Sequence, residues 1–224
     1  MGIALPPALA KNQEILALSM VSVDQLCCLD GLIWLQSGNA VGALTRQHQT
    51  TVSRNQKKCA KTLGVDVLKR DGRWQIEGDS QLLQLERSVH QVARLKLVRS
   101  LRLEATLSAD TNLPEGTASE WVFGTSRIQN PKHFSELLKQ RVIDAWLTPW
   151  SATEAGDAEL AWIPLWDEPD DVGLMVQRDL REQHPIRLLS DNLSAQHLLR
   201  PFVLQAPGPG GSDSTSPINH QLIP

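Results

Sequence analysis

The residues between Thr50 and Arg73 carry side chains suited to one kind of chemistry, the recognition of a nucleic acid. Arginine pairs with guanine, asparagine and glutamine pair with adenine, and lysine and threonine suit phosphates. Both Arg54 and Gln56 are expected to point outward. The candidate DNA-binding residues are Thr50, Thr51, Ser53, Arg54, Asn55, Gln56, Lys57, Lys58, Lys61, Lys69, Arg70 and Arg73. The alternative is a solvated basic helix that meets no DNA.

Charge is distributed unevenly along the 224 residues, which together carry a net charge of −3. From Gly38 to Gln75 there are eight basic and two acidic residues, a net charge of +6. From Ser108 onward there are eight basic and sixteen acidic residues, a net charge of −8. A basic module joined to an acidic one is expected when only one part contacts a polyanion. Chance variation between small domains is the alternative.

Two helices and a turn are predicted to position the candidate residues. Apolar residues up to Leu35 predict a helix that ends near Gln36, with Asp24 as its N-cap and turn residues after it. A short helix over residues 39–46 and a turn over 47–50 follow. Thr50 or Thr51 is expected to cap the basic helix, which Gly64 ends.

A β-hairpin is predicted directly after the basic helix. Short strands over residues 67–69 and 74–76 flank a turn that contains Asp71-Gly72, which is a strong hairpin signal. Helix, short helix, turn, basic helix and hairpin together describe a winged helix-turn-helix. In that arrangement the basic helix enters the major groove of DNA and the hairpin touches the flanking backbone.

A long helix is predicted to begin at Ser80. Its apolar stripe advances in steps of three and four residues through Leu82, Leu85, Val89, Val92, Leu95, Val98, Leu101 and Ala105. About 26 residues would span ~39 Å. A helix of this length with an apolar seam needs a partner, and a second copy of residues 80–106 is the preferred one. Packing against the chain's own C-terminal half is the alternative.

The C-terminal half is predicted to alternate strands and helices after a linker over residues 108–119. Strands are expected at residues 121–124, 142–147, 161–166 and 172–177, with a helix at residues 131–139. Strand, helix and strand in this order indicate a βαβ unit and an α/β domain. Residues 1–15 are expected to be a flexible arm, and residues 206–224 a disordered tail.

The segment from residue 24 to residue 105 resembles the N-terminal part of the LysR-type transcriptional regulators. The matching residues are Leu26, Leu29, Leu44, Val52-Ser53-Arg54, Leu63-Gly64-Val65, Val67-Leu68 and Arg70, followed by the long helix in the place of that family's dimerisation helix. Thr50-Thr51 stand where the family usually has a proline, the Leu44 to Ser53 spacing is one residue longer, and Leu68 replaces a common phenylalanine. The resemblance implies a dimer that binds duplex DNA, with assembly into tetramers left open.

The C-terminal half resembles the periplasmic-binding-protein-like effector domain of that family only in fragments. Residues 141–145, 163–176 and His184-Pro185 carry this likeness. About 85 residues are present, fewer than a two-lobed effector domain needs, so a small-molecule effector is an open alternative. The expected fold is α/β overall. Its parts are a winged helix-turn-helix over residues 16–78, a linker helix over 79–107 and a shortened effector-like domain over 120–205.

Other function classes find little support in the sequence. Cys27, Cys28 and Cys59 have neither a disulfide pattern nor a zinc-binding spacing, so buried thiols in a reducing, cytoplasmic compartment are expected. No catalytic motif, phosphate loop or membrane span is recognisable, and neither an enzyme, a cofactor nor a metal is predicted. The acidic residues 167–171 are interpreted as a solvated loop rather than a cation site.

Five tryptophans lie in the C-terminal half: Trp121, Trp146, Trp150, Trp162 and Trp166. They are expected to be core or interface anchors, and a ligand pocket is the alternative. The sequence is therefore consistent with two functions. The first is a dimeric, sequence-specific DNA-binding transcription regulator. The second is a small-ligand or protein-interaction module that keeps a structural winged helix without binding DNA.

Overall fold

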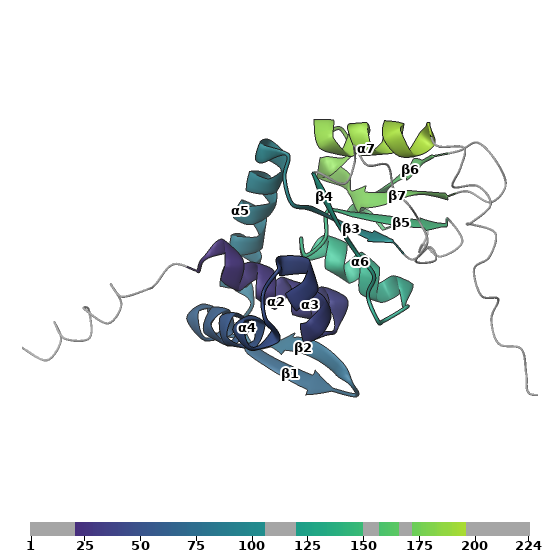
Figure 1. Cartoon of the computed structure of the whole chain (residues 1–224). Helices are drawn as coiled ribbons and strands as arrows, with labels where there is room; N and C mark the ends of the chain where they lie inside the picture. The colour runs from purple at the N-terminus through teal and green to yellow at the C-terminus, as the bar shows by residue number, and fades with distance from the viewer. Residues whose placement is uncertain (1–20, 106–119, 150–156, 166–171, 196–224) are drawn as a thin grey trace, which may run out of the picture.

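The computed structural model describes residues 21–105, 120–149, 157–165 and 172–195 (Figure 1). The predictions for the arm, for the linker over 108–119, for the tail, for Trp150 and Trp166 and for the acidic residues 167–171 lie outside these ranges.

The N-terminal part is a winged helix. Helices α2 (Val23–Leu35), α3 (Gly38–Thr45) and α4 (Gln49–Leu63) precede strands β1 (Asp66–Arg70) and β2 (Arg73–Glu77). The two prediction errors here concern caps. Ser22 rather than Asp24 caps α2, because it forms a capping box with Gln25. His48 rather than a threonine caps α4, because its ring accepts a hydrogen bond from the Thr50 amide.

The predicted hairpin turn is confirmed. Strands β1 and β2 pair antiparallel, with Arg70 opposite Arg73. The two turn residues have positive φ angles, 49° at Asp71 and 77° at Gly72. This is the left-handed pair that a type I′ turn requires, and it matches the natural twist of a hairpin.

Helix α5 (Gln81–Leu97) is shorter than predicted, and the expectation of one helix to residue 106 is wrong. Val98 and Ser100 adopt left-handed backbone angles, and the chain then forms β3 (Leu101–Ala105). Leu101 and Leu103, assigned by the sequence pattern to a helical stripe, instead lie in a strand that is buried on both faces. The alternation of apolar and charged residues in this segment fits a strand equally well.

The C-terminal part is one mixed sheet in the order β4-β3-β5-β7-β6. Strands β4 (Trp121–Gly124) and β5 (Ala145–Pro149) both run parallel to β3, and α6 (Pro131–Lys139) joins them. The predicted strand–helix–strand unit is present, although β3 lies between its two strands. Strands β6 (Leu160–Pro164) and β7 (Val172–Gln177) add an antiparallel edge. A short 3-10 helix, η2 (Arg178–Leu180), precedes α7 (His184–Ser194).

The sheet is covered on both faces, by α7 on one side and by α6 on the other (Figure 1). Side chains of α7 pack with Leu101 and Leu103 in one core cluster. On the other face α6 contributes Phe134 and Leu137 to a cluster that continues into α2 through Ile33 and Trp34. The winged helix therefore packs against the α/β domain through a shared apolar core.

Two smaller sequence predictions are settled by burial. Trp121 and Trp146 lie in the core, as expected, and Trp162 is half-buried. Cys28 and Cys59 are buried and carry free thiols, as expected, whereas Cys27 is partly exposed. Burial raises the pKa of the Cys59 thiol to about 12, which keeps it protonated and unreactive at neutral pH.

Candidate nucleic-acid interface

Helix α4 presents one cationic face to solvent and one apolar face to the core. Val52, Cys59 and Leu63 are buried against the other helices. Arg54, Lys57, Lys58 and Lys61 fall on the opposite side at helical spacing and are exposed, together with Thr50. The outward orientation predicted for Arg54 and the lysines is thus present.

No acidic residue occurs in the sequence between Asp30 and Asp66, so the positive charge of α4 is not neutralised locally along the chain. Two further basic side chains lead into the helix. Arg46 is exposed in a left-handed conformation at the end of α3, and exposed His48 caps α4. Arg46 is one of the eight basic residues of the positively charged segment, but it is not among the predicted DNA-binding residues. Its position directly before the turn could have indicated a contact.

Gln56 does not face solvent, and its predicted contact with adenine is corrected. The side chain is only 6% exposed, and its Oε1 has no hydrogen-bond partner among the described residues. Gln56 follows Val52 by four residues and precedes Cys59 by three, so it falls on the buried stripe of α4. Helical spacing alone could have assigned it to the inside.

Asn55 is also engaged within the protein. Its amide donates to Gln47 Oε1 at 3.2 Å and lies 3.8 Å from Cys28 Sγ. Thr51 and Ser53 are half-buried beside it. Arg54 is therefore the exposed candidate on α4 for base edges, with the lysines one turn or more beyond it. Thr50 is also exposed, but its hydroxyl is hydrogen-bonded to His48 Nδ1 at 2.9 Å.

The hairpin presents the remaining candidates. Lys69, Arg70 and Arg73 are all exposed. Arg70 forms an ion pair with Glu77 at 2.8 Å, and the Lys69 ammonium lies 5.8 Å from the centre of the Trp74 ring. An exposed ion pair of this kind exchanges readily with other anions, so Arg70 remains available to a phosphate. Figure 1 shows α4 and the hairpin on the side of the molecule away from the five-stranded sheet.

Helix α5 has the reverse polarity of α4. The side buried within the chain is mostly polar, with Leu83, Arg87, Gln91 and Arg94 following one another at helical spacing. The solvent side carries a mostly apolar stripe, with Lys96 exposed beside it. The exposed large apolar residues are Leu82 (54%), Leu85 (59%), Val89 (65%), Val92 (48%) and Leu97 (66%). An apolar stripe left in water along a whole helix marks an interaction surface.

The buried cations of α5 are held by two buried carboxylates. Arg87 Nε donates to Asp30 Oδ1 at 2.8 Å, and Arg102 of β3 donates to Asp30 Oδ2 at 2.9 Å. Arg94 donates to both oxygens of Asp144, at 2.8 and 3.0 Å. Burial would raise the pKa of Asp30, but the charges of Arg87 and Arg102 outweigh burial and lower it. Asp30 therefore ties α2, α5 and β3 together as a carboxylate.

A second polar contact joins the winged helix to the sheet. The Trp34 indole donates to the buried Glu104 carboxylate at 2.5 Å, and the Ser126 amide donates to the same group. Trp34 also lies so close to Gly124 that a Cβ added there would be 2.4 Å from the indole ring. Burial raises the pKa of Glu104 to about 7, and the two hydrogen bonds only partly oppose this.

No family model and no curated protein matches the sequence. The chain is similar to several solved structures of transcription regulators. A full-length OxyR variant from Pseudomonas aeruginosa shares 15% identity at a TM-score of 0.36, covering 67% of this chain and 56% of that one. CrgA, a LysR-type transcriptional regulator from Neisseria meningitidis, shares 16% identity at a TM-score of 0.26, with 66% and 54% covered.

An OxyR mutant from Corynebacterium glutamicum gives 16% identity, a TM-score of 0.31 and coverage of 66% and 50%. The chain thus spans about half the length of the solved structures that it resembles.

Two further observations concern only the described residues. None of their helices is long and apolar enough to cross a membrane. Their His, Cys, Asp and Glu side chains form no group of three or more that could hold a metal ion.

Proposed function

We propose that this protein is a transcription regulator of LysR type that binds duplex DNA as a dimer through its winged helix. The outward face of α4 carries the proposal. Arg54, Lys57, Lys58 and Lys61 are exposed there on one stripe, with no acidic residue nearby in the sequence. A helix that follows a tight turn and projects cations fits the major groove, where arginine reads guanine and lysine contacts phosphates.

The hairpin supports the same function. Lys69, Arg70 and Arg73 project from β1 and β2 beside α4, where a wing meets the backbone that flanks the groove. With Gln56 buried and Asn55 bonded to Gln47, Arg54 becomes the main base-reading residue of the helix.

The exposed apolar stripe of α5 is the proposed dimer surface. Two copies of α5 packed through Leu82, Leu85, Val89 and Val92 would remove these side chains from water. Dimerisation would place two α4 helices on the DNA, so the binding site should contain two related half-sites in successive major grooves. We also propose that the α/β domain begins at Leu101 rather than near residue 120, because β3 belongs to its sheet.

Selection of bound sequences from a random duplex pool, followed by gel shifts over a salt titration, tests the proposal. The enriched site is expected to contain two half-sites, and binding is expected to weaken linearly on a double-logarithmic salt plot. Arg54→Ala should cost about 1–3 kcal/mol at one base-pair position and relax the preference there. Arg187→Ala, an exposed arginine on α7, is the matched control and should bind as the wild type does.

A module that keeps a structural winged helix without binding DNA is the competing function. The buried Gln56 and engaged Asn55 favour it, since two residues suited to base contacts face the protein. No salt-sensitive binding to any duplex, or equal binding by the wild type and Arg54→Ala across the selected pool, would support this second function.

A further inference from the structure

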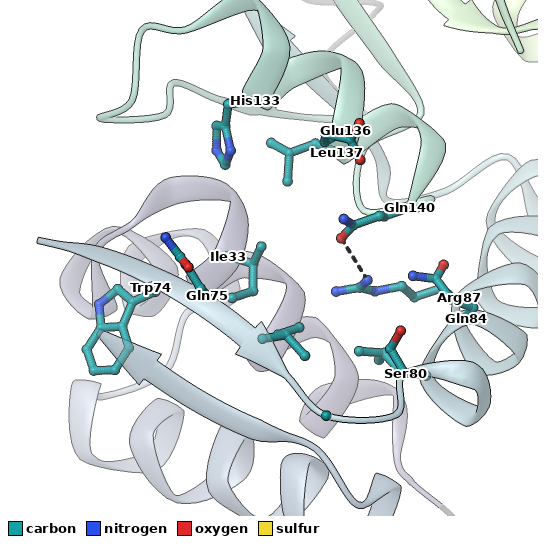
Figure 2. Close-up of a pocket in the computed structure, with 13 residues that line it drawn as sticks. Ile33, Trp74, Gln75, Ser80, Gln84, Arg87, His133, Glu136, Leu137 and Gln140 are labelled. Carbon is teal, nitrogen blue, oxygen red and sulfur yellow. Dashed lines mark hydrogen bonds between the residues drawn. The ribbon is translucent and has the colours of Figure 1, made fainter. Parts of the chain in front are cut away.

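A cavity of about 320 Å³ lies between the winged helix and the α/β domain, and it is called the α2 cavity below. Its walls come from α2, from the end of α3 and the turn after it, from α5 and from the start of the sheet. This volume is usual for small-molecule sites. A second cavity, of about 240 Å³, lies beside β2 and α6 (Figure 2). Its arginine, Arg87, is only 1% exposed and is bonded to Asp30 and Gln140, so that cavity offers a ligand little contact.

One face of α2 forms a long wall of the α2 cavity. Val23, Cys27, Gly31 and Trp34 line the cavity and follow one another in steps of three or four residues, which places them on the same side of the helix. The helix rises about 16 Å from the first of them to the last. Leu26, Leu44 and Val122 make the lining mostly apolar. An extended apolar wall of this kind suits a hydrocarbon chain, which gains free energy when it leaves water.

The exposed residues of the lining mark where the α2 cavity opens to solvent. They are Val23, Asp24, Arg99 and Ser100. Trp34, at the far end of the wall, is buried. Arg99 forms no ion pair with another described residue, so its guanidinium is available to an incoming carboxylate.

The other charged residues of the lining do not replace Arg99 in this role. Arg94 and Arg102 are bound to buried aspartates. Burial lowers the pKa of His90, so its ring is neutral at pH 7. Asp24 carries the opposing charge, but it lies in the first turn of α2, where the helix dipole partly offsets a negative charge. The opening therefore suits a single carboxylate at Arg99.

We propose that the α2 cavity binds an aliphatic monocarboxylate of medium chain length, with its chain along α2 and its carboxylate at Arg99. The lining also contains Gln47, in the turn directly before α4. Gln47 accepts a hydrogen bond from Asn55 of α4 at 3.2 Å, so a bound chain would contact a residue that holds the DNA-binding helix. That regulatory consequence rests on the proposed function, whereas binding itself does not.

Calorimetric titration of the full chain at pH 7 with butanoate, hexanoate and octanoate tests the site. Each added pair of methylene groups should tighten binding roughly tenfold, because it leaves water for an apolar wall. Octanol keeps the chain but lacks the charge, and it should bind about fivefold more weakly than octanoate, which is the effect of one exposed ion pair. No binding of octanoate at about 2 mM, or an affinity that does not depend on chain length, would overturn the proposal.

Cys27 reports whether the ligand occupies this cavity. Its thiol is partly exposed and lies 3.3 Å from Arg102 Nη2, whereas Cys28 and Cys59 are buried. Bound octanoate should slow the alkylation of Cys27 by iodoacetamide in proportion to occupancy, and acetate at the same concentration should not. Mass spectrometry of the peptide that contains Cys27 measures the rate. Octanoate binding that leaves this rate unchanged would place the ligand elsewhere and overturn the assignment.

Two variants test the two ends of the bound chain. Arg99→Gln should reduce octanoate affinity about fivefold and leave octanol affinity unchanged. Val122→Phe fills part of the cavity, so both ligands should bind about tenfold more weakly or not at all. Lys96→Gln removes an exposed cation of α5 outside the lining and is the matched control, which should bind as the wild type does. Equal losses in Arg99→Gln and Lys96→Gln would overturn the placement of the carboxylate.

Circular dichroism establishes that each variant is folded, and if Val122→Phe does not fold, the Arg99→Gln titration and the protection of Cys27 still decide. Because these measurements contain no DNA, their outcome is separate from that of the proposed function. Ligand binding without DNA binding would keep the site and remove the regulator, and the reverse result would keep the regulator and remove the site.

Discussion

Helices α4 and α5 both carry basic and apolar side chains but direct them oppositely. On α4 the cations face water and Val52, Cys59 and Leu63 face the core. On α5 the two arginines are buried within the chain, whereas an apolar stripe faces water, formed by Leu82, Leu85, Val89, Val92 and Leu97. On α4 the apolar side is buried within the chain. On α5 the apolar side is exposed, and an apolar surface of this kind needs a partner to cover it. The position of a cation relative to the other elements, and not its type, decides its role.

The largest loss of stability is expected from removing the Asp30 carboxylate, which pairs with the buried Arg87 and Arg102. Asp30→Ala leaves Arg87 and Arg102 buried without their anion, and should lower the free energy of unfolding by about 3–5 kcal/mol. Urea denaturation followed by circular dichroism measures this. Asp66→Ala, an exposed aspartate on β1, should change stability by less than about 0.5 kcal/mol. Equal losses in the two variants would contradict the role assigned to the buried network.

The exposed face of α5 gives the second prediction. Val89→Glu places a charge at the centre of the proposed dimer surface in both copies, and should raise the dimer dissociation constant by roughly a hundredfold, about 3 kcal/mol. Analytical ultracentrifugation over a concentration series measures it. Leu188→Glu changes an exposed apolar residue on α7 and is the control. A wild-type chain that is monomeric at every concentration would rule out this surface as the dimer interface.

The third prediction concerns the pH dependence of the contact between Trp34 and Glu104. The folded-state pKa of Glu104 is about 7, above the ordinary value of 4.5, so the folded chain binds the proton more tightly. The resulting stabilisation is complete below pH 4.5 and is lost as the pH rises to about 7. Between pH 5 and pH 8 the wild type should therefore lose about 2–3 kcal/mol relative to Glu104→Gln.

Urea denaturation of both proteins at the two pH values checks this. Taking the difference between the two proteins cancels the opposite contributions of His90 and His133, whose pKa values are lowered by burial. Parallel pH profiles for the wild type and Glu104→Gln would show that the carboxyl does not titrate in this range.

The fourth prediction tests the cationic face of α4. Lys58→Ala should weaken binding to all duplexes by a similar factor and reduce the slope of the salt dependence by about 0.9, the value for one phosphate contact. Gel shifts from 50 to 200 mM salt with the selected site and a scrambled site measure it. A loss confined to the selected site would show that Lys58 reads a base rather than a phosphate.

The smallest effect is expected from the amide buried in α4. Gln56→Leu replaces a polar side chain whose oxygen lacks a partner among the described residues with an apolar one of similar size. Stability should stay equal or rise by about 1 kcal/mol, and DNA affinity should change less than twofold. A large loss of base preference in this variant would show that Gln56 contacts DNA.

The sequence alone determined the local elements around the candidate DNA-binding face. Helical spacing, Asp71-Gly72 and Gly64 were sufficient for α4 and the hairpin, because caps, turns and 3.6-residue periodicity act within a few residues. The same signals could have assigned Gln56 to the inside. Only the tertiary structure decided that Leu101 to Ala105 form a strand, since the charged residues of this segment match either a helix or a strand until their partners are known.

Those partners come from far along the chain. Arg102 contacts Asp30, and Glu104 contacts Trp34, each across about 70 residues of sequence. From the neighbouring sequence alone, charged residues such as Arg102 and Glu104 would be predicted to lie on the surface. Burial of a charge depends on a counter-charge brought close by the fold, and no local spacing encodes that. For the same reason the docking of the winged helix on the sheet, and the cavity between them, are properties of the folded chain.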